Sequence, residues 1–215
     1  MYRHVIMEHQ VMENTSTRNV YSYQEYRDLM DRLVAEGKTT GPNQSEEFAY
    51  YTELNHKRMR RLDKTAQLTP ELKEAAEKVD RDLTFLILTE AWCGDAAQNI
   101  PLFQKMAEAN PHIKIQLVLR DENLDLMDQH LTNGGRAIPK AVFIDDQSQE
   151  ILGSWGPRPA PAQQMVMDYK ALPKEEKPHY SEFVVEVQKW YNGDKTLTAQ
   201  AELVTVMNET IHANG

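Results

Sequence analysis

The chain has a single cysteine, Cys93, among its 215 residues. One cysteine cannot form an intramolecular disulfide, so any disulfide bond of Cys93 must join it to another molecule. The paired cysteines that make zinc signatures specific are also missing, and no two of the seven histidines stand at a helical metal-binding spacing. We therefore expect neither a metal site nor a bound cofactor.

The sequence also lacks a run of roughly 20 apolar residues, the length that spans a bilayer. Its opening segment, MYRHVIMEHQVMENTS, lacks the apolar core of a signal peptide. The net charge of -9 argues against a protein that binds phosphate backbones, because such binding needs concentrated Lys and Arg. We expect a cytoplasmic protein that binds neither nucleic acid nor membranes; the pattern leaves its oligomeric state open.

The first third of the chain carries helix signals. Apolar residues at helical spacing predict a helix over 21–36 that stops at Gly37, a common helix terminator. Ser45 is a favourable N-cap for a second helix. Proline in the first turn favours a third helix over 70–80.

The middle of the chain alternates between strand and helix patterns. The continuous apolar run over 83–90 predicts a strand that is covered on both faces. Two parallel strands joined by a helix form a right-handed unit, and its reactive loops lie at the carboxyl ends of the strands. The predicted elements are strands over 83–90, 113–119, 140–144 and 150–155, and helices over 95–109, 123–131, 159–171, 181–191 and 196–207.

Cys93 lies between the predicted buried strand and the helix that follows it, within Trp92-Cys93-Gly94-Asp95. Unpaired N–H groups and the macrodipole at a helix N-terminus favour the thiolate over the thiol. A thiolate can attack a disulfide, a peroxide or another electrophile. The alternative is that the lone cysteine is a small buried hydrophobe.

Two segments around this cysteine, LTEAWCGDA and RAIPKAVFID, resemble the thioredoxin superfamily in sequence, order and spacing. The resemblance covers residues 83–169. It implies an α/β, three-layer thioredoxin-like fold with a mixed sheet, helices on both faces, and extra helices at both ends. We expect a helical extension over 1–80 that packs on the core, a thioredoxin-like core over 81–172, and C-terminal helices over 173–215.

The resemblance also implies roles for individual residues. Cys93 matches the attacking cysteine, and Trp92 matches the tryptophan that precedes it. Pro139 matches the cis-proline that faces the sulfur, and Ile138 supplies backbone groups for an extended substrate. A cis X–Pro bond is accessible, and proline has no N–H to leave unpaired in such a turn.

Three positions depart from the family pattern. The second cysteine falls at Ala96, the intervening proline at Asp95, and the buried acid at Ile87. An acid that assists a second thiol has no task where that thiol is absent, so we interpret the site as a one-cysteine site. Such a site can form a mixed disulfide but needs an external thiol to resolve it.

Three charged residues are candidate modulators of the thiol. Asp95 suits the first helical turn, yet its charge opposes thiolate formation. Glu90 is either a nearby proton acceptor or a solvated carboxylate at the end of a strand. Arg136 either stabilises the thiolate or an anionic substrate, or is an arginine of a solvent-facing loop.

A basic run over 56–61 is the one concentration of positive charge in this acidic chain. Such runs usually form solvated helix faces. However, Arg58 shares a helical stripe with Asn55 and Leu62, so it can face the thiol pocket and bind an anionic thiol. The segment with Trp155 and Arg158 is a further candidate wall, or a turn that caps the core.

These patterns predict a monothiol thioredoxin-like thiol–disulfide oxidoreductase that acts through a mixed disulfide at Cys93. Its partner would be a disulfide- or thiol-bearing protein or a low-molecular-weight thiol. The alternative is a non-catalytic thioredoxin-fold binding module that uses the same groove. A thiol peroxidase is disfavoured because no threonine is placed ahead of the cysteine as in those enzymes.

Overall fold

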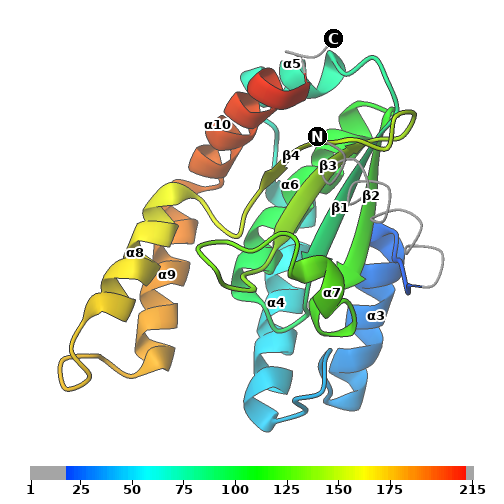
Figure 1. Ribbon diagram of the computed structural model, residues 1–215. Coiled ribbons are helices and arrows are strands. Elements are labelled where there is room, and N and C mark those ends of the chain that lie inside the picture. Colours follow the sequence, from blue (N-terminus) through cyan, green and yellow to red (C-terminus); the bar gives the residue numbers. More distant parts are fainter. Residues whose placement is uncertain (1–17, 212–215) are drawn as a thin grey trace.

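The computed structural model describes residues 18–211, so the expectation drawn from residues 1–16 lies outside the described part. Helices come first, strands and helices then alternate, and helices close the chain (Figure 1). The strands are β1 (Leu83–Thr89), β2 (Ile113–Leu119), β3 (Lys140–Asp145) and β4 (Ile151–Trp155). The α-helices are α3 (Tyr23–Glu36), α4 (Glu46–Thr65), α5 (Pro70–Glu77), α6 (Gly94–Ala109), α7 (Leu124–Met127), α8 (Ala160–Ala171), α9 (Tyr180–Asp194) and α10 (Leu197–Val206).

The first three of these helices have local signals at their ends. The Ser22 side chain and Glu25 form a reciprocal capping box at the start of α3. That helix ends at Gly37, whose φ of 63° is a left-handed conformation that glycine adopts without steric cost. The Ser45 and Thr69 side chains each accept a backbone N–H in the first turn of α4 and α5.

The four strands form one mixed sheet in the order β2-β1-β3-β4. Strand β1 pairs in parallel with β2, with Leu83 opposite Ile113, and antiparallel with β3, which in turn pairs antiparallel with β4. All seven residues of β1 are buried, as expected for a strand between two others with helices over the sheet. The predicted α/β fold with a mixed sheet is confirmed.

One large hydrophobic core joins this sheet to helices from both ends of the chain. Its centre is aromatic: the ring centroids of Phe85 and Phe143 lie 4.5 Å apart, and Phe103 packs edge-on to Phe85 at 6.2 Å. Met30 of α3 and Leu203 of α10 are fully buried in the same core. The extra helices therefore share the core of the sheet. The domain boundaries at 80/81 and 172/173 stay a prediction.

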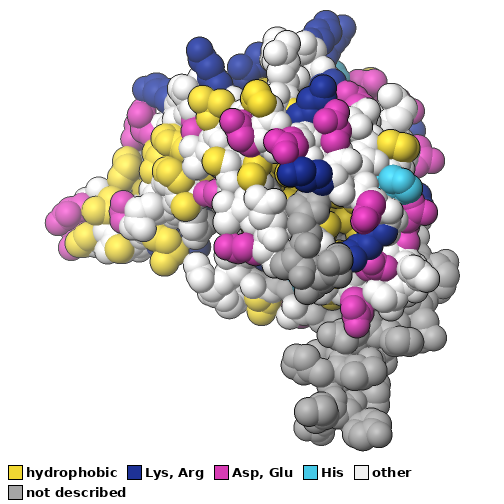
Figure 2. Space-filling view, turned by 90° about the horizontal axis from the view of Figure 1, so that it is seen from above, with side chains coloured by type: hydrophobic (Ala, Val, Ile, Leu, Met, Phe, Trp, Pro, Cys, Tyr) yellow, Lys and Arg dark blue, Asp and Glu magenta, His cyan; other side chains and the backbone are white. Residues whose placement is uncertain are grey.

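Helices α8 and α9 form an antiparallel pair that projects from the rest of the molecule (Figure 1). Ala162, Val187 and Tyr191 form a small core between them, separate from the main one. Figure 2 shows hydrophobic side chains gathered on this projecting part, and Met167 and Val185 are among the exposed ones.

Helix α7 is shorter than the helix predicted over 123–131, and a 3₁₀ turn, Arg120–Glu122, precedes it. After Met127 the backbone bonds tighten from i→i−4 to i→i−3, as in the bond from the His130 N–H to the Met127 carbonyl. Such bonds close turns and do not extend an α-helix. Among the described residues, no helix is both long and apolar enough to cross a membrane.

Candidate functional site

Cys93 is the N-cap of α6, directly after the loop that leaves β1. Its Sγ accepts the backbone N–H of Ala96 at 3.5 Å and lies 3.3 Å from the carbonyl oxygen of Ile138, to which the thiol donates. The Ile138–Pro139 peptide bond is cis. The fold thus places the thiol against the turn that starts β3, 46 residues further along the sequence.

The thiol of Cys93 is 7% exposed, and burial raises its pKa to about 12. The negative charge of Asp95 raises the pKa further. The Ala96 N–H and the nearby Arg158 cation oppose these effects without cancelling them. The resting side chain is therefore a neutral thiol, and the expectation that the helix N-terminus would favour the thiolate is outweighed by desolvation.

Asp95 is held by two side chains from the C-terminal half of the chain. Arg158 donates to its Oδ2 from Nε at 2.9 Å, and the Tyr191 hydroxyl donates to its Oδ1 at 2.7 Å. Both partners are at least half-buried, so these are strong, charge-assisted bonds. The Asp95 side chain beside the thiol is consequently fixed in place.

A pocket of about 380 Å³, here called the Cys93 pocket, opens beside the thiol. Trp92 forms part of its wall: its ring packs on Phe48 at a centroid distance of 4.9 Å, and the Arg120 guanidinium lies 4.9 Å from the ring centroid. Helix α9 closes another side. The lining residues are Glu47, Phe48, Tyr51, Arg58, Trp92, Cys93, Gly94, Asp95, Arg120, Arg136, Ala137, Ile138, Arg158, Tyr180 and Val184.

Comparison with known proteins identifies the family to which this fold belongs. A family model described as thioredoxin matches residues 41–171. The chain belongs to the thioredoxin family. The family match begins ahead of α4, so it includes Arg58 as well as Cys93 and Pro139.

Solved structures agree with this thioredoxin fold. A protein of unknown function from Pseudomonas aeruginosa superimposes with a TM-score of 0.53 at 19% identity, covering 87% of this chain and 98% of that one. An HIV epitope scaffold gives a TM-score of 0.51 at 18% identity, with coverage of 87% and 98%. No curated protein sequence matches the chain significantly.

Most of the candidate residues of this thioredoxin-family site lie together. Trp92, Ile138, Arg136 and Arg58 all line the Cys93 pocket. Arg136 is exposed at its edge and pairs with Asp128 through Nε at 2.6 Å and Nη2 at 2.8 Å. These residues therefore meet at one pocket, as the sequence interpretation requires, and their role in binding stays a prediction.

Glu90 departs from one of the two interpretations offered for it. It is not a solvated carboxylate, because it is fully buried. Its Oε1 accepts the backbone N–H of Asp121 at 2.8 Å, whereas Oε2 has no partner among the described residues. Burial raises its pKa. The Glu90 carboxyl thus holds the loop after β2; it makes no hydrogen bond to the Cys93 thiol within the described part of the chain, and its role as a proton acceptor stays a prediction.

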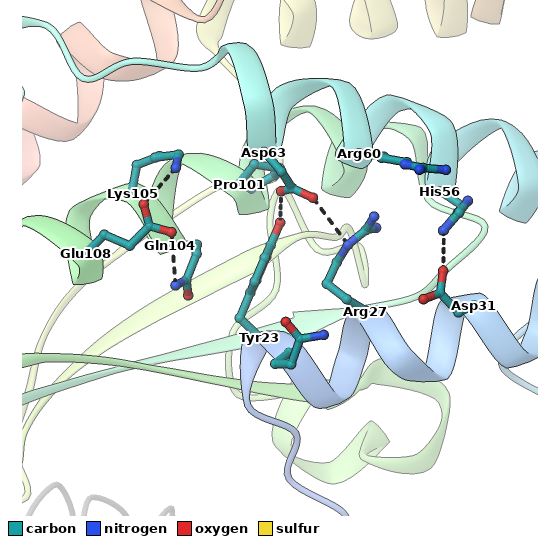
Figure 3. A pocket seen from close by; sticks show the side chains of 11 residues that line it. Tyr23, Arg27, Asp31, His56, Arg60, Asp63, Pro101, Gln104, Lys105 and Glu108 are labelled. Atoms are coloured by element: carbon teal, nitrogen blue, oxygen red, sulfur yellow. Dashed lines mark hydrogen bonds and ion pairs between the residues drawn. The ribbon is translucent and has the colours of Figure 1, made fainter.

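The basic run over 56–61 divides between two faces of α4. Arg58 faces the Cys93 pocket, while His56 and Arg60 line a separate groove between α3, α4 and α6 (Figure 3). In that groove His56 pairs with Asp31 at 2.5 Å. Asp63 accepts from the Tyr23 hydroxyl and forms an ion pair with Arg27 at 3.4 Å. Its acidic groups thus have local cationic or hydroxyl partners.

Sequence reasoning missed several walls of the pocket. Arg120 directly follows β2, and the rule that parallel strands end at one edge of a sheet was a signal that could have found it. Tyr180 and Val184 come from α9. Tertiary packing places this helix beside the thiol, and no local sequence pattern predicts that position. Among residues 18–211 there is no group of three or more side chains suited to hold a metal ion.

Proposed function

We propose that this thioredoxin-family protein is a monothiol thiol–disulfide oxidoreductase that forms a mixed disulfide at Cys93. The observation that carries the proposal is the position of Sγ: it accepts the Ala96 N–H at the start of α6, lies 3.3 Å from the Ile138 carbonyl, and lines a pocket of about 380 Å³. A sulfur so placed has both a stabilising donor for its anion and room for a second sulfur. The partner is a disulfide- or thiol-bearing protein or a low-molecular-weight thiol.

The reaction begins when the Cys93 thiol gives its proton to water. The thiolate attacks one sulfur of a disulfide, the S–S bond of the substrate breaks, and the released thiolate takes a proton from solvent. A second thiol then attacks the substrate sulfur of the mixed disulfide and restores Cys93. This step needs an external thiol because the chain has no second cysteine.

Because burial raises the pKa of Cys93 to about 12, the thiol form dominates at pH 7 and only a very small fraction of molecules carries a thiolate. The proposed reaction is therefore slow at neutral pH and accelerates about tenfold per pH unit in the alkaline range. The thiolate that does form is a strong nucleophile, since nucleophilicity rises with thiol pKa.

The test is to incubate the protein with excess bis(2-hydroxyethyl) disulfide at pH 7–10 and measure its intact mass. We expect one adduct that dithiothreitol removes and that Cys93→Ser lacks. Circular dichroism checks that both proteins are folded. A folded protein that gains no adduct even at pH 10 would exclude the proposed chemistry.

A second candidate is a non-catalytic binding module that uses the same pocket. The raised pKa of Cys93 favours it, because the burial and the neighbouring Asp95 carboxylate both suppress the nucleophile. This candidate predicts that Cys93→Ser retains its bound partners, whereas the oxidoreductase loses covalent capture.

A further inference from the structure

Four arginines line the Cys93 pocket, and three of them have a carboxylate partner. These pairs are Arg120–Asp121 at 2.8 Å, Arg136–Asp128 at 2.6 Å and Arg158–Asp95 at 2.7 Å. The fourth, Arg58, makes no ion pair with any residue in the described range 18–211. Arg58 is therefore the one arginine of the pocket without an ion pair in that range; the Asp95 carboxylate acts on its charge only from a longer distance.

Arg58 is half-buried, and its position is set by a buried amide. Its Nη1 donates to Asn55 Oδ1 at 2.7 Å, and Asn55 Nδ2 donates to the Ala91 carbonyl at 3.0 Å. Asn55 is fully buried, so the chain fixes one edge of the guanidinium and leaves its other N–H groups available. This burial partly removes the charge of Arg58 from water and so lowers its pKa.

The guanidinium lies close to the thiol loop. A Cβ atom placed on Gly94, the residue after Cys93, would lie 3.6 Å from Arg58 Nη1. An anion bound to Arg58 is therefore held within a small molecule's length of Sγ. Phe48, Trp92 and Tyr180 supply apolar walls for the carbon skeleton between them.

We propose that Arg58 binds the carboxylate, sulfonate or phosphate of a small disulfide-bearing substrate whose sulfur reacts at Cys93. The proposal rests on the proposed function and names its substrate class. A small molecule fits better than a protein, because α4 and α9 wall the pocket on separate sides and its volume of about 380 Å³ is in the range for small ligands. A partly desolvated guanidinium without an ion pair gains most from an anion that forms charge-assisted hydrogen bonds.

The kinetic test uses two disulfides with the same –S–CH₂–CH₂– skeleton: bis(2-sulfonatoethyl) disulfide, which is anionic, and bis(2-hydroxyethyl) disulfide, which is neutral. We expect wild type to form the sulfonate adduct about tenfold faster than the hydroxyl adduct, the effect of a charge-assisted hydrogen bond. In Arg58→Gln this rate ratio falls to about one. The ratio cancels any change in thiol reactivity that affects both reagents.

Arg60→Gln is the matched control, since Arg60 lies on the same helix but lines the groove against α3. We expect it to keep the wild-type ratio. A ratio near one in wild type, or an equal ratio in wild type and Arg58→Gln, would overturn the proposal.

Binding without chemistry separates this proposal from the proposed function. In ¹⁵N-labelled Cys93→Ser, 2-hydroxyethanesulfonate should shift the Trp92 indole and Arg58 Nε signals saturably, and ethylene glycol should not. If the signals shift saturably but wild type forms no disulfide adduct, the anion site is supported and the redox function is excluded. No shift with the sulfonate would exclude the anion site, and shifts only with an acidic peptide would reassign it to a protein partner.

Discussion

Arg158 holds the carboxylate of Asp95 through two guanidinium nitrogens, with Nε at 2.9 Å and Nη2 at 2.7 Å from Oδ2. Asp95 lies two residues after Cys93, in the first turn of α6. The ion pair therefore fixes a negative charge beside the thiol and partly neutralises it. The reactivity of Cys93 depends on both members of the pair.

The first prediction concerns Asp95→Asn. Removing the carboxylate removes a charge that raises the pKa of Cys93, and it leaves the Arg158 cation nearby. We expect the midpoint of iodoacetamide alkylation to fall from about 12 by about one unit. The reaction at neutral pH should then be about threefold faster, because about tenfold more thiolate forms but each thiolate is a weaker nucleophile. Glu74→Gln, an exposed change on α5, should leave the profile unchanged. Identical profiles for wild type and Asp95→Asn would contradict the prediction.

Arg158→Gln tests the same pair in the opposite sense. Without the guanidinium, the Asp95 charge acts on the thiol with less compensation, so the pKa of Cys93 rises further. We expect alkylation at pH 9 to be several-fold slower than in wild type. A faster reaction in this variant would show that Arg158 suppresses the thiol and does not support its ionisation.

Glu90 gives a prediction about stability and pH. Burial raises the pKa of Glu90 in the folded state above its unfolded value near 4.5. Below that unfolded value the carboxyl is protonated in both states, and the folded protein bears no cost for a buried charge. As the pH rises through the folded pKa the buried group must ionise, and the free energy of unfolding falls. From pH 4 to 8, wild type should lose stability relative to Glu90→Gln, by about 1.4 kcal/mol for each unit of pKa difference. Urea denaturation at each pH measures this, with the exposed Glu176→Gln as control. Parallel stability curves for wild type and Glu90→Gln would refute it.

Local patterns were sufficient to predict much of the fold. The cap at Ser45, the proline in the first turn of α5, the apolar run of β1 and the helical stripe of Arg58 depend on neighbours in sequence. They can therefore be inferred without the tertiary structure. The resemblance to the thioredoxin superfamily implied in addition that Pro139 would face Cys93. The family match and the mixed sheet confirm the fold that these signals predicted.

The remaining features depend on segments that are distant in sequence. Glu90 is buried because Thr40 and the loop at Asp121 lie against it, and neither is near it along the chain. Tyr180 reaches the pocket through the α8–α9 pair, whose direction is set by packing. The high pKa of Cys93 follows from the burial of its thiol among segments that are distant in sequence. The periodicity of the sequence does not reveal that burial.

Gly156 gives a prediction about the cis-proline turn. Its φ is +119°, and a Cβ atom there would lie 2.2 Å from the Pro139 carbonyl oxygen, which is a backbone atom that cannot easily move. Gly156→Ala should destabilise the protein by about 2–4 kcal/mol. Gly193→Ala in α9 is the matched control: nothing lies within 4 Å of its added Cβ, and it should stabilise by about 0.5–1 kcal/mol. Equal thermal midpoints for the two variants would contradict this account of the turn.

The last prediction restores the second cysteine of the family. Ala96 is 2% exposed, and its N–H lies 3.5 Å from Cys93 Sγ, so a thiol at this position would lie beside the sulfur that forms the mixed disulfide. In Ala96→Cys the added thiol should attack that mixed disulfide, release the substrate thiol and leave an intramolecular disulfide. With bis(2-hydroxyethyl) disulfide, wild type should accumulate the adduct, whereas Ala96→Cys should end at its own mass less two hydrogens.

Ala97→Cys is the matched control, because Ala97 is equally buried, at 1% exposure, but lies one residue further around the helix. Its thiol points about 100° away from the position at Ala96, so we expect it to leave the adduct at Cys93 unresolved. Circular dichroism checks that both variants fold. A persistent adduct in folded Ala96→Cys, or the same product from both variants, would mean that Cys93 does not present its mixed disulfide toward the first turn of α6. A second cysteine at position 96 would then not be enough to free this site from the need for an external thiol.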